Sequence, residues 1–166
     1  MRPILFIDRD GVILEEPKTD FQIDHIDKTS FIPGAITNLN KIATELGFYK
    51  VMVTNQDGLG TDAYPTNQFE PFQQLMIRTL AAENFVFDEI KVDTSFAKDN
   101  LPTRKPGIGL VQQLAQARSH GHMPLHIRFG VGPLVRTLVA SISEDIRLLS
   151  VQQAVGFDHI VDVARC

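Results

Sequence analysis

The sequence predicts an α/β fold in which parallel strands form one sheet and crossover helices cover its faces. Apolar runs of strand length alternate along the chain with longer segments of helical periodicity, which is typical of parallel strands joined by helices. The chain has 166 residues, of which 43% are apolar and 22% charged, and this suits one well-buried domain. We therefore expect a single domain over residues 1–166.

The strands are expected at three apolar runs. These are ILFI at 4–7, YKVMVTN at 49–55 and FDEIKVD at 87–93. Because segments long enough for a helix separate them, we expect the strands to pair in parallel.

Amphipathic helices are expected between and after these strands. The segment 33–48 begins with Pro and Gly, and its apolar stripe consists of Ile36, Leu39, Ile42, Ala43 and Leu46. In the segment 67–85, where Pro71 leaves the helix start open, the stripe consists of Phe69, Phe72, Leu75, Met76 and Leu80. Both stripes have helical spacing. A third helix is expected over 107–118.

The composition favours a small, diffusing substrate. The formal charge of -4 gives no reason to expect nucleic acid or an anionic membrane as a partner, because both attract basic surfaces. Cys166 is the only cysteine, so we expect no internal disulfide and a reducing, cytoplasmic location. The start MRPILFIDRD has too short an apolar run for a signal peptide, and no later segment is typical of a membrane span.

One segment departs from the composition of the rest. Residues 100–143 contain no Asp or Glu, and the basic residues there are Arg104, Lys105, Arg118, Arg128 and Arg136. The segment is either a basic face that attracts phosphate or a stretch that has drifted or been read in a shifted frame.

Two acids follow the first expected strand at once. Asp8 and Asp10 stand in ILFIDRDGVI, and Gly11 allows the chain to turn away directly after them. Ligands of open parallel sheets bind beyond the carboxyl ends of the strands. Two carboxylates there favour a bound cation or a shared proton, although a solvated acidic turn would also place them there.

The motifs resemble the haloacid dehalogenase superfamily of phosphohydrolases. Its first motif is a hydrophobic strand followed by D-x-D-G-[TV], and FIDRDGVI matches it. Thr54 in VMVTNQDGLG stands at the second motif, and Lys105 in TRKPG stands at the third. The resemblance implies a three-layer Rossmann-like sheet with crossover helices.

Phosphoryl transfer explains these residue types. A carboxylate that attacks a phosphate monoester approaches a dianion, so the phosphoryl oxygens need a cation, a hydroxyl and an ammonium around them. Mg²⁺, Thr54 and Lys105 would supply these three.

A narrower resemblance is to the histidinol-phosphate phosphatase domain of a bifunctional histidine-biosynthesis enzyme. The similarity is strong over residues 3–110, with DFQID and TNQDGLGT as diagnostic stretches, and is degraded over 111–166. It implies that Asp8 forms a phosphoaspartyl intermediate and that Asp10 protonates the leaving oxygen and then activates water. Mg²⁺ would be held by the Asp8 side chain and the Asp10 backbone carbonyl.

The same resemblance implies a set of substrate-binding residues. The phosphate would lie against Thr54, Asn55 and Lys105, with Arg104 beside them. The loop EEPKTDFQID would cover the imidazole and the amine, and its candidate contacts are Glu16, Asp20 and Phe21.

The sequence departs from the family at two metal sites. Many members carry a Cys/His zinc loop before the lysine, but this segment reads VDTSFAKDNLPTRKPG, so no zinc is expected. The fourth motif, G-D-x-x-x-D, supplies the acids that complete the Mg²⁺ shell. The best register here is IRFGVGPLVRTL, with Val131 and Val135 in place of both acids.

Other acids are poor replacements for these two. Glu144 and Asp145 precede IRLL, the expected fifth strand, and so belong at the opposite end of the sheet. Asp57 and Asp93 are nearer, but neither matches the motif.

Two further stretches contain residue types typical of sites. The histidines of RSHGHMPLHIRFGVG, which are His120, His122 and His126, suit a solvated loop better than a metal site. The stretch VGFDHIVDVARC is loosely similar to a segment of imidazoleglycerol-phosphate dehydratase, the partner domain in the bifunctional enzyme, so a longer relative would carry that domain.

Three functions remain open from the sequence. The leading hypothesis is an Mg²⁺-dependent histidinol-phosphate phosphatase with low activity. The second is a non-catalytic member of the fold that still binds phosphate. The third is a phosphatase of sugar phosphates or nucleic acid 3′ ends, which the loop TDFQID disfavours.

Overall fold

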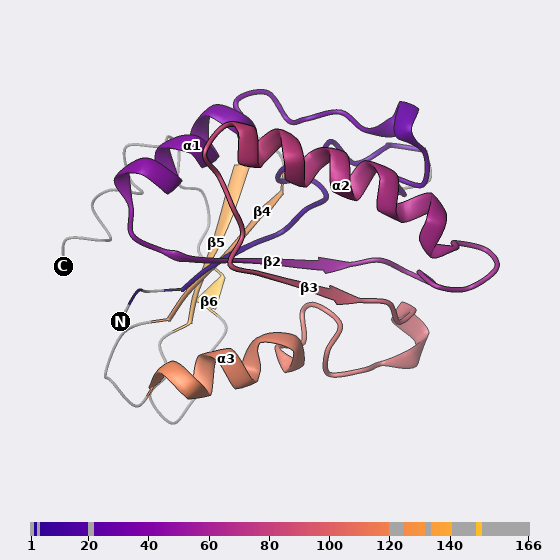
Figure 1. Ribbon diagram of the computed structural model, residues 1–166. Coiled ribbons are helices and arrows are strands. Elements are labelled where there is room, and N and C mark those ends of the chain that lie inside the picture. Colours follow the sequence, from indigo (N-terminus) through magenta and orange to yellow (C-terminus); the bar gives the residue numbers. More distant parts are fainter. Residues whose placement is uncertain are drawn as a thin grey trace.

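The computed structural model describes residues 2, 4–19, 22–119, 125–131, 134–140 and 149–150, with side chains as far as residue 114 (Figure 1). Its elements form a sheet with helices on both sides. The strands are β1 (Ile4–Ile7), β2 (Tyr49–Asn55), β3 (Glu89–Asp93), β4 (Leu125–Val131), β5 (Leu134–Ala140) and β6 (Leu149–Ser150). The helices are α1 (Ala35–Glu45), α2 (Thr66–Ala82) and α3 (Gly109–Ser119), and two short 3₁₀ turns lie at Ile26–Lys28 and Ala97–Asp99.

The strand order is β3-β2-β1-β4-β5-β6. The strands β3, β2, β1 and β4 pair in parallel, as predicted, because a helix returns the chain between successive members. The strands β5 and β6 pair antiparallel. Only two residues separate β4 from β5, so this connection has to be a hairpin.

Three layers define the fold. Figure 1 shows α1 and α2 on one face of the sheet and α3 on the other. Between the sheet and the first two helices lies a core that includes Ile7, Met52, Leu39, Phe72 and Met76. On the other face, Phe6 and Val53 pack in a second cluster with Val111 of α3. The predicted three-layer α/β architecture is confirmed.

The predicted helices are present, with some differences in detail. In α2, Leu75 is 39% exposed although it was assigned to the apolar stripe. Each helical residue turns the direction of the side chain by about 100°, so Leu75 points away from the sheet when its neighbour Met76 is fully buried. Pro71 lies inside the helix, which begins at Thr66.

The fifth strand was predicted wrongly. The fifth strand was expected at IRLL, residues 146–149, but β5 lies at Leu134–Ala140; of the expected stretch the structure describes Leu149, the first residue of β6. Residues 146–148 lie outside the described part of the chain. None of the described helices is long and apolar enough to cross a membrane.

The parallel register brings the strand ends of β1 and β2 together. Ile7 lies opposite Met52, so Asp8 emerges close to the end of β2, where Thr54 and Asn55 stand. Gly11 adopts a φ of 72°, which a side chain would strain, and the turn closes through a hydrogen bond from the Gly11 N–H to the Leu14 carbonyl at 2.8 Å. The chain therefore leaves the sheet at once and keeps both acids at its edge.

Candidate active site

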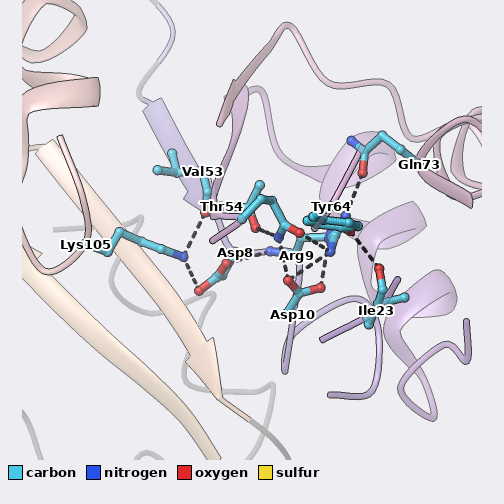
Figure 2. Close-up of polar contacts among 10 residues, drawn as sticks. Asp8, Arg9, Asp10, Ile23, Val53, Thr54, Tyr64, Gln73 and Lys105 are labelled. Atoms are coloured by element: carbon cyan, nitrogen blue, oxygen red, sulfur yellow. Dashed lines mark hydrogen bonds and ion pairs between the residues drawn. The ribbon is translucent and has the colours of Figure 1, made fainter. Parts of the chain in front are cut away.

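Asp8 lies directly after β1 at the carboxyl edge of the sheet and is largely buried. Its Oδ1 accepts a hydrogen bond from the Arg9 backbone N–H at 2.8 Å, and its Oδ2 forms an ion pair with the Lys105 ammonium (Figure 2). Only 17% of the side chain is exposed. Burial raises the pKa of Asp8 above its ordinary value, because the lowering by Lys105 offsets this desolvation only in part.

Lys105 reaches Asp8 from the loop between β3 and α3. Its ammonium also donates to the Val53 carbonyl at 3.0 Å. The Asn55 side chain holds the backbone of the lysine, since Asn55 Oδ1 accepts from the Lys105 N–H at 3.1 Å and Nδ2 donates to the Lys105 carbonyl at 3.3 Å. Asn55, expected against the phosphate, thus holds the lysine at the end of β2.

Both carboxylate oxygens of Asp10 accept hydrogen bonds. Arg9 Nε donates to Asp10 Oδ1 at 2.7 Å and Arg9 Nη2 donates to Oδ2 at 3.0 Å. Gln56 Nε2 donates to Asp10 Oδ2 at 2.7 Å and to Thr54 Oγ1 at 2.7 Å. Gln56 therefore links the second predicted motif, at Thr54, to the second acid of the first motif.

Arg9 is fully buried beside the two acids. Its Nη2 donates to Gln56 Oε1 at 2.8 Å, and its Nη1 donates to Gln73 Oε1 at 3.3 Å (Figure 2). The guanidinium carbon lies 5.0 Å from the ring centre of Phe69 and 5.6 Å from that of Phe72.

Arg9, Gln56 and Gln73 were not predicted as parts of the site. One signal was available, because Arg9 stands between two acids at the end of a buried strand. Sequence alone does not show that its side chain turns inward toward α2.

Glu16 lies near both acids. Partial burial raises its pKa, and the carboxylates of Asp10 and Asp8 raise it further. The segment after this loop is anchored at Ile23, whose carbonyl accepts from the Tyr64 hydroxyl at 2.8 Å. Burial raises the pKa of Tyr64 to about 12, so the hydroxyl keeps the proton that it donates. The other expected contacts of this loop, Asp20 and Phe21, lie outside the described residues.

The side chain of Arg104 contacts Asp57 and the Ser95 carbonyl and is not directed toward Asp8. Its Nη1 is ion-paired with Asp57 and donates to the Ser95 carbonyl at 2.7 Å. The Asp93 carboxylate accepts hydrogen bonds from Ser95, of which the backbone one is 3.0 Å long. Asp57, which follows β2, and Asp93, which ends β3, are therefore both paired with residues of the loop between β3 and α3, Arg104 and Ser95.

The fourth-motif positions lie on the hairpin beside β1. Val131 ends β4, and Val135 belongs to β5, where it pairs with Gly130. His126 lies in β4, opposite Leu5. The two remaining histidines, His120 and His122, and the acids Glu144 and Asp145 lie outside the described residues.

A magnesium ion would need oxygen ligands at this edge. Mg²⁺ is bound through one or two carboxylates, and water and substrate phosphate complete its shell. Among the described side chains, no group of three or more His, Cys, Asp or Glu could hold a metal ion. Asp8 is paired with Lys105, and Asp10 is paired with Arg9. The described residues would therefore supply only part of a magnesium shell, and water and substrate phosphate would have to supply the rest.

Solved structures with a similar fold define the class of this domain. A D,D-heptose 1.7-bisphosphate phosphatase from B. bronchiseptica, solved with magnesium and phosphate, matches with a TM-score of 0.64 and 24% identity, over 76% of this chain and 69% of that chain. A putative had-like phosphatase from Mesorhizobium loti matches with a TM-score of 0.54 and 20% identity, over 70% and 57%. The chain thus has the fold of the haloacid dehalogenase-like phosphatases.

Proteins of similar sequence give a narrower comparison than proteins of similar fold. The "Histidine biosynthesis bifunctional protein HisB" of Stenotrophomonas maltophilia is 48% identical over 119 residues, which are 72% of this chain and 33% of that protein. The HisB protein of Spirosoma linguale is 46% identical over 117 residues, which are 70% and 31%. No family model matches the chain. The chain spans about a third of these relatives, and the predicted resemblance to a histidinol-phosphatase domain is confirmed.

Proposed function

We propose that this chain hydrolyses L-histidinol phosphate through a phosphoaspartyl intermediate on Asp8. The observation that carries the proposal is the buried pair of Asp8 and Lys105, which lies beside Asp10 and Thr54 at the carboxyl edge of the sheet. The similarity to HisB, which is named for histidine biosynthesis, supports this substrate.

Lys105 prepares the site for an anionic substrate. In the free site its ammonium pairs with Asp8. A phosphate dianion that enters beside this pair can share the ammonium, which offsets its repulsion from the carboxylate. The Thr54 oxygen accepts from Gln56, so the hydroxyl proton remains to be donated to a phosphoryl oxygen.

The first chemical step transfers the phosphoryl group to Asp8. One carboxylate oxygen of Asp8 forms a bond to phosphorus while the bond from phosphorus to the ester oxygen breaks. Asp10, as a carboxylic acid, gives its proton to the departing alkoxide and becomes a carboxylate. Histidinol then leaves the site.

The second step releases phosphate. The Asp10 carboxylate removes a proton from water, and the water oxygen bonds to phosphorus while the phosphorus–oxygen bond to Asp8 breaks. This regenerates the Asp8 carboxylate and the Asp10 acid. The two proton transfers balance over one turnover.

Magnesium is the cation that accompanies this chemistry in our proposal. When bound, Mg²⁺ supplies charge stabilisation at the phosphoryl oxygens. Because the described residues offer few free carboxylate oxygens, we expect weak binding of the metal, with half-maximal phosphate release on the order of 1 mM Mg²⁺ or above. A titration of Mg²⁺ against phosphate release measures this value, and saturation at micromolar Mg²⁺ would contradict it.

We expect Glu16 to favour a substrate that carries a positive charge. The amine of histidinol phosphate is positive, and Glu16 stands close enough to Asp8 for the carboxylates to influence one another. We expect Glu16→Gln to raise KM for L-histidinol phosphate roughly 5- to 20-fold with little change in kcat, as loss of a charge-assisted contact does. Steady-state kinetics of phosphate release measures both constants.

A neighbouring acid supplies the control for Glu16. Glu15 is also exposed, and Glu15→Gln removes the same charge one residue away. A second control replaces the substrate by its analogue with a hydroxyl in place of the amine, for which Glu16→Gln should leave KM unchanged. Equal rises in KM for both esters would show that Glu16 does not bind the amine.

A non-catalytic role in phosphate binding is the second candidate function. It is favoured by the valines at positions 131 and 135, where the fourth motif has acids. Phosphate release from L-histidinol phosphate, measured for the wild type against Asp8→Asn, separates the two functions. We also propose, from the bifunctional relatives of greater length, that a longer relative carries an imidazoleglycerol-phosphate dehydratase domain.

A further inference from the structure

We infer that Arg9 is a positioning residue that fixes the Asp10 carboxyl for proton transfer to the leaving group. This inference rests on the proposed function and adds a residue that the motifs did not single out. Arg9 is 0% exposed and does not touch Asp8 through its side chain in any described contact. It acts through Asp10.

Many contacts hold the Arg9 guanidinium in place. Burial of an unpaired charge is costly, so a buried arginine has to be paired and hydrogen-bonded. Here the partners are Asp10, Gln56 and Gln73, and the aromatic faces of Phe69 and Phe72 lie against the cation. A guanidinium held on every side cannot rotate away from Asp10.

The two-point contact also fixes the orientation of Asp10. The planar guanidinium binds both carboxylate oxygens, through Nε to Oδ1 and through Nη2 to Oδ2, and such a fork sets the plane of its partner. Oδ2 accepts a second hydrogen bond, from Gln56. Oδ1 accepts a single hydrogen bond among the described contacts, so it is the oxygen with room for a further contact with the leaving group.

Proton transfer depends on such placement. An acid contributes to catalysis only when it lies within hydrogen-bond reach of the leaving oxygen, and a small displacement sharply reduces that contribution. Arg9, held by α2 through Gln73 and the two phenylalanines, connects the position of Asp10 to the rigid helix.

A merely structural ion pair would give a different result. If Arg9 only stabilised the fold, its loss would reduce the hydrolysis of every phosphate ester by the same factor. If it positions the acid, its loss affects only esters whose leaving group needs a proton. L-Histidinol phosphate releases an alkoxide that needs one, whereas p-nitrophenyl phosphate releases a stable phenolate that does not.

The experiment compares kcat/KM for these two esters, because this constant reports the steps up to phosphoryl transfer. For Arg9→Met we expect a loss of about 30- to 300-fold with L-histidinol phosphate, within the range of general acid catalysis, and of less than about threefold with p-nitrophenyl phosphate. Arg9→Lys keeps the charge but lacks the fork, so an intermediate, equally selective loss is expected. It also provides a test if Arg9→Met does not fold.

Arg2→Met is the matched control. Arg2 forms an exposed ion pair with Asp88 at 2.8 Å, near the amino end of β1 and far from the acids, and its loss should leave both constants unchanged. Equal losses for the two esters in folded Arg9 variants would overturn the inference while the proposed function stands. A wild type that hydrolyses neither ester would overturn the proposed function, and the inference with it.

Discussion

Replacement of Asp8 by asparagine is expected to reduce phosphate release from L-histidinol phosphate by at least about 1,000-fold, to the background of the assay. The amide cannot attack phosphorus, and Asp8 is the carboxylate that pairs with the Lys105 ammonium. Phosphate release over time in saturating Mg²⁺ measures the loss.

A matched variant separates chemistry from folding in this test. Asp88→Asn removes an acid of the same type from the Arg2 ion pair, and it should retain wild-type activity. Thermal unfolding of both variants checks that each is folded. A folded Asp8→Asn variant that releases phosphate as fast as the wild type would exclude Asp8 as the nucleophile, and equal slow rates would leave the non-catalytic function.

Replacement of Lys105 by methionine is expected to lower kcat/KM about 100-fold, which is typical for the loss of one group that stabilises a developing anion. The lysine is the described cation in contact with Asp8. Its ammonium lowers the pKa of Asp8 against the effect of burial, so its removal raises that pKa further. The kcat/KM value for L-histidinol phosphate measures the first effect, and its pH profile measures the second.

The sign of the pH effect follows from the need for an ionised nucleophile. Activity falls as the pH drops through the pKa of Asp8, so a higher pKa moves the acid limb of the profile to higher pH. Lys91→Met is the control, because it removes a lysine paired with Glu89 on β3 at 2.8 Å and should leave the profile in place. A Lys105→Met profile with an unmoved acid limb would show that the lysine does not act on Asp8.

The parallel half of the fold followed from the sequence because its signals are local. The apolar runs at 4–7 and 49–55 are strands, and the stripe that begins at Phe69 lies on α2. Periodicity of side chains is enough to predict such elements. The antiparallel β5 was not predicted, because residues 134–140 have no alternation that distinguishes a hairpin partner from a parallel strand.

The candidate site was likewise predicted only in part from the sequence. The motif ILFIDRDGVI and the two later motifs predicted that Asp8, Asp10, Thr54 and Lys105 would be brought together at one edge of the sheet, and the structure brings them together. Asn55 and Arg104 were expected on the phosphate, but their side chains hold the Lys105 backbone and Asp57. The sequence does not show which of two nearby polar partners a side chain selects.

The order of the elements as far as α3 and the identity of the acids follow from the sequence alone, because hydrophobic periodicity and a strand followed by D-x-D-G are properties of neighbouring residues. The burial of Arg9 against Phe69 and Phe72 and its two-point contact with Asp10 arise only when the chain has folded. The contact with α2 joins residues about 60 positions apart in the chain. Its stability comes from ion pairing, hydrogen bonds and packing that offset the desolvation of the guanidinium, and these contacts exist only after the helix has closed over the sheet.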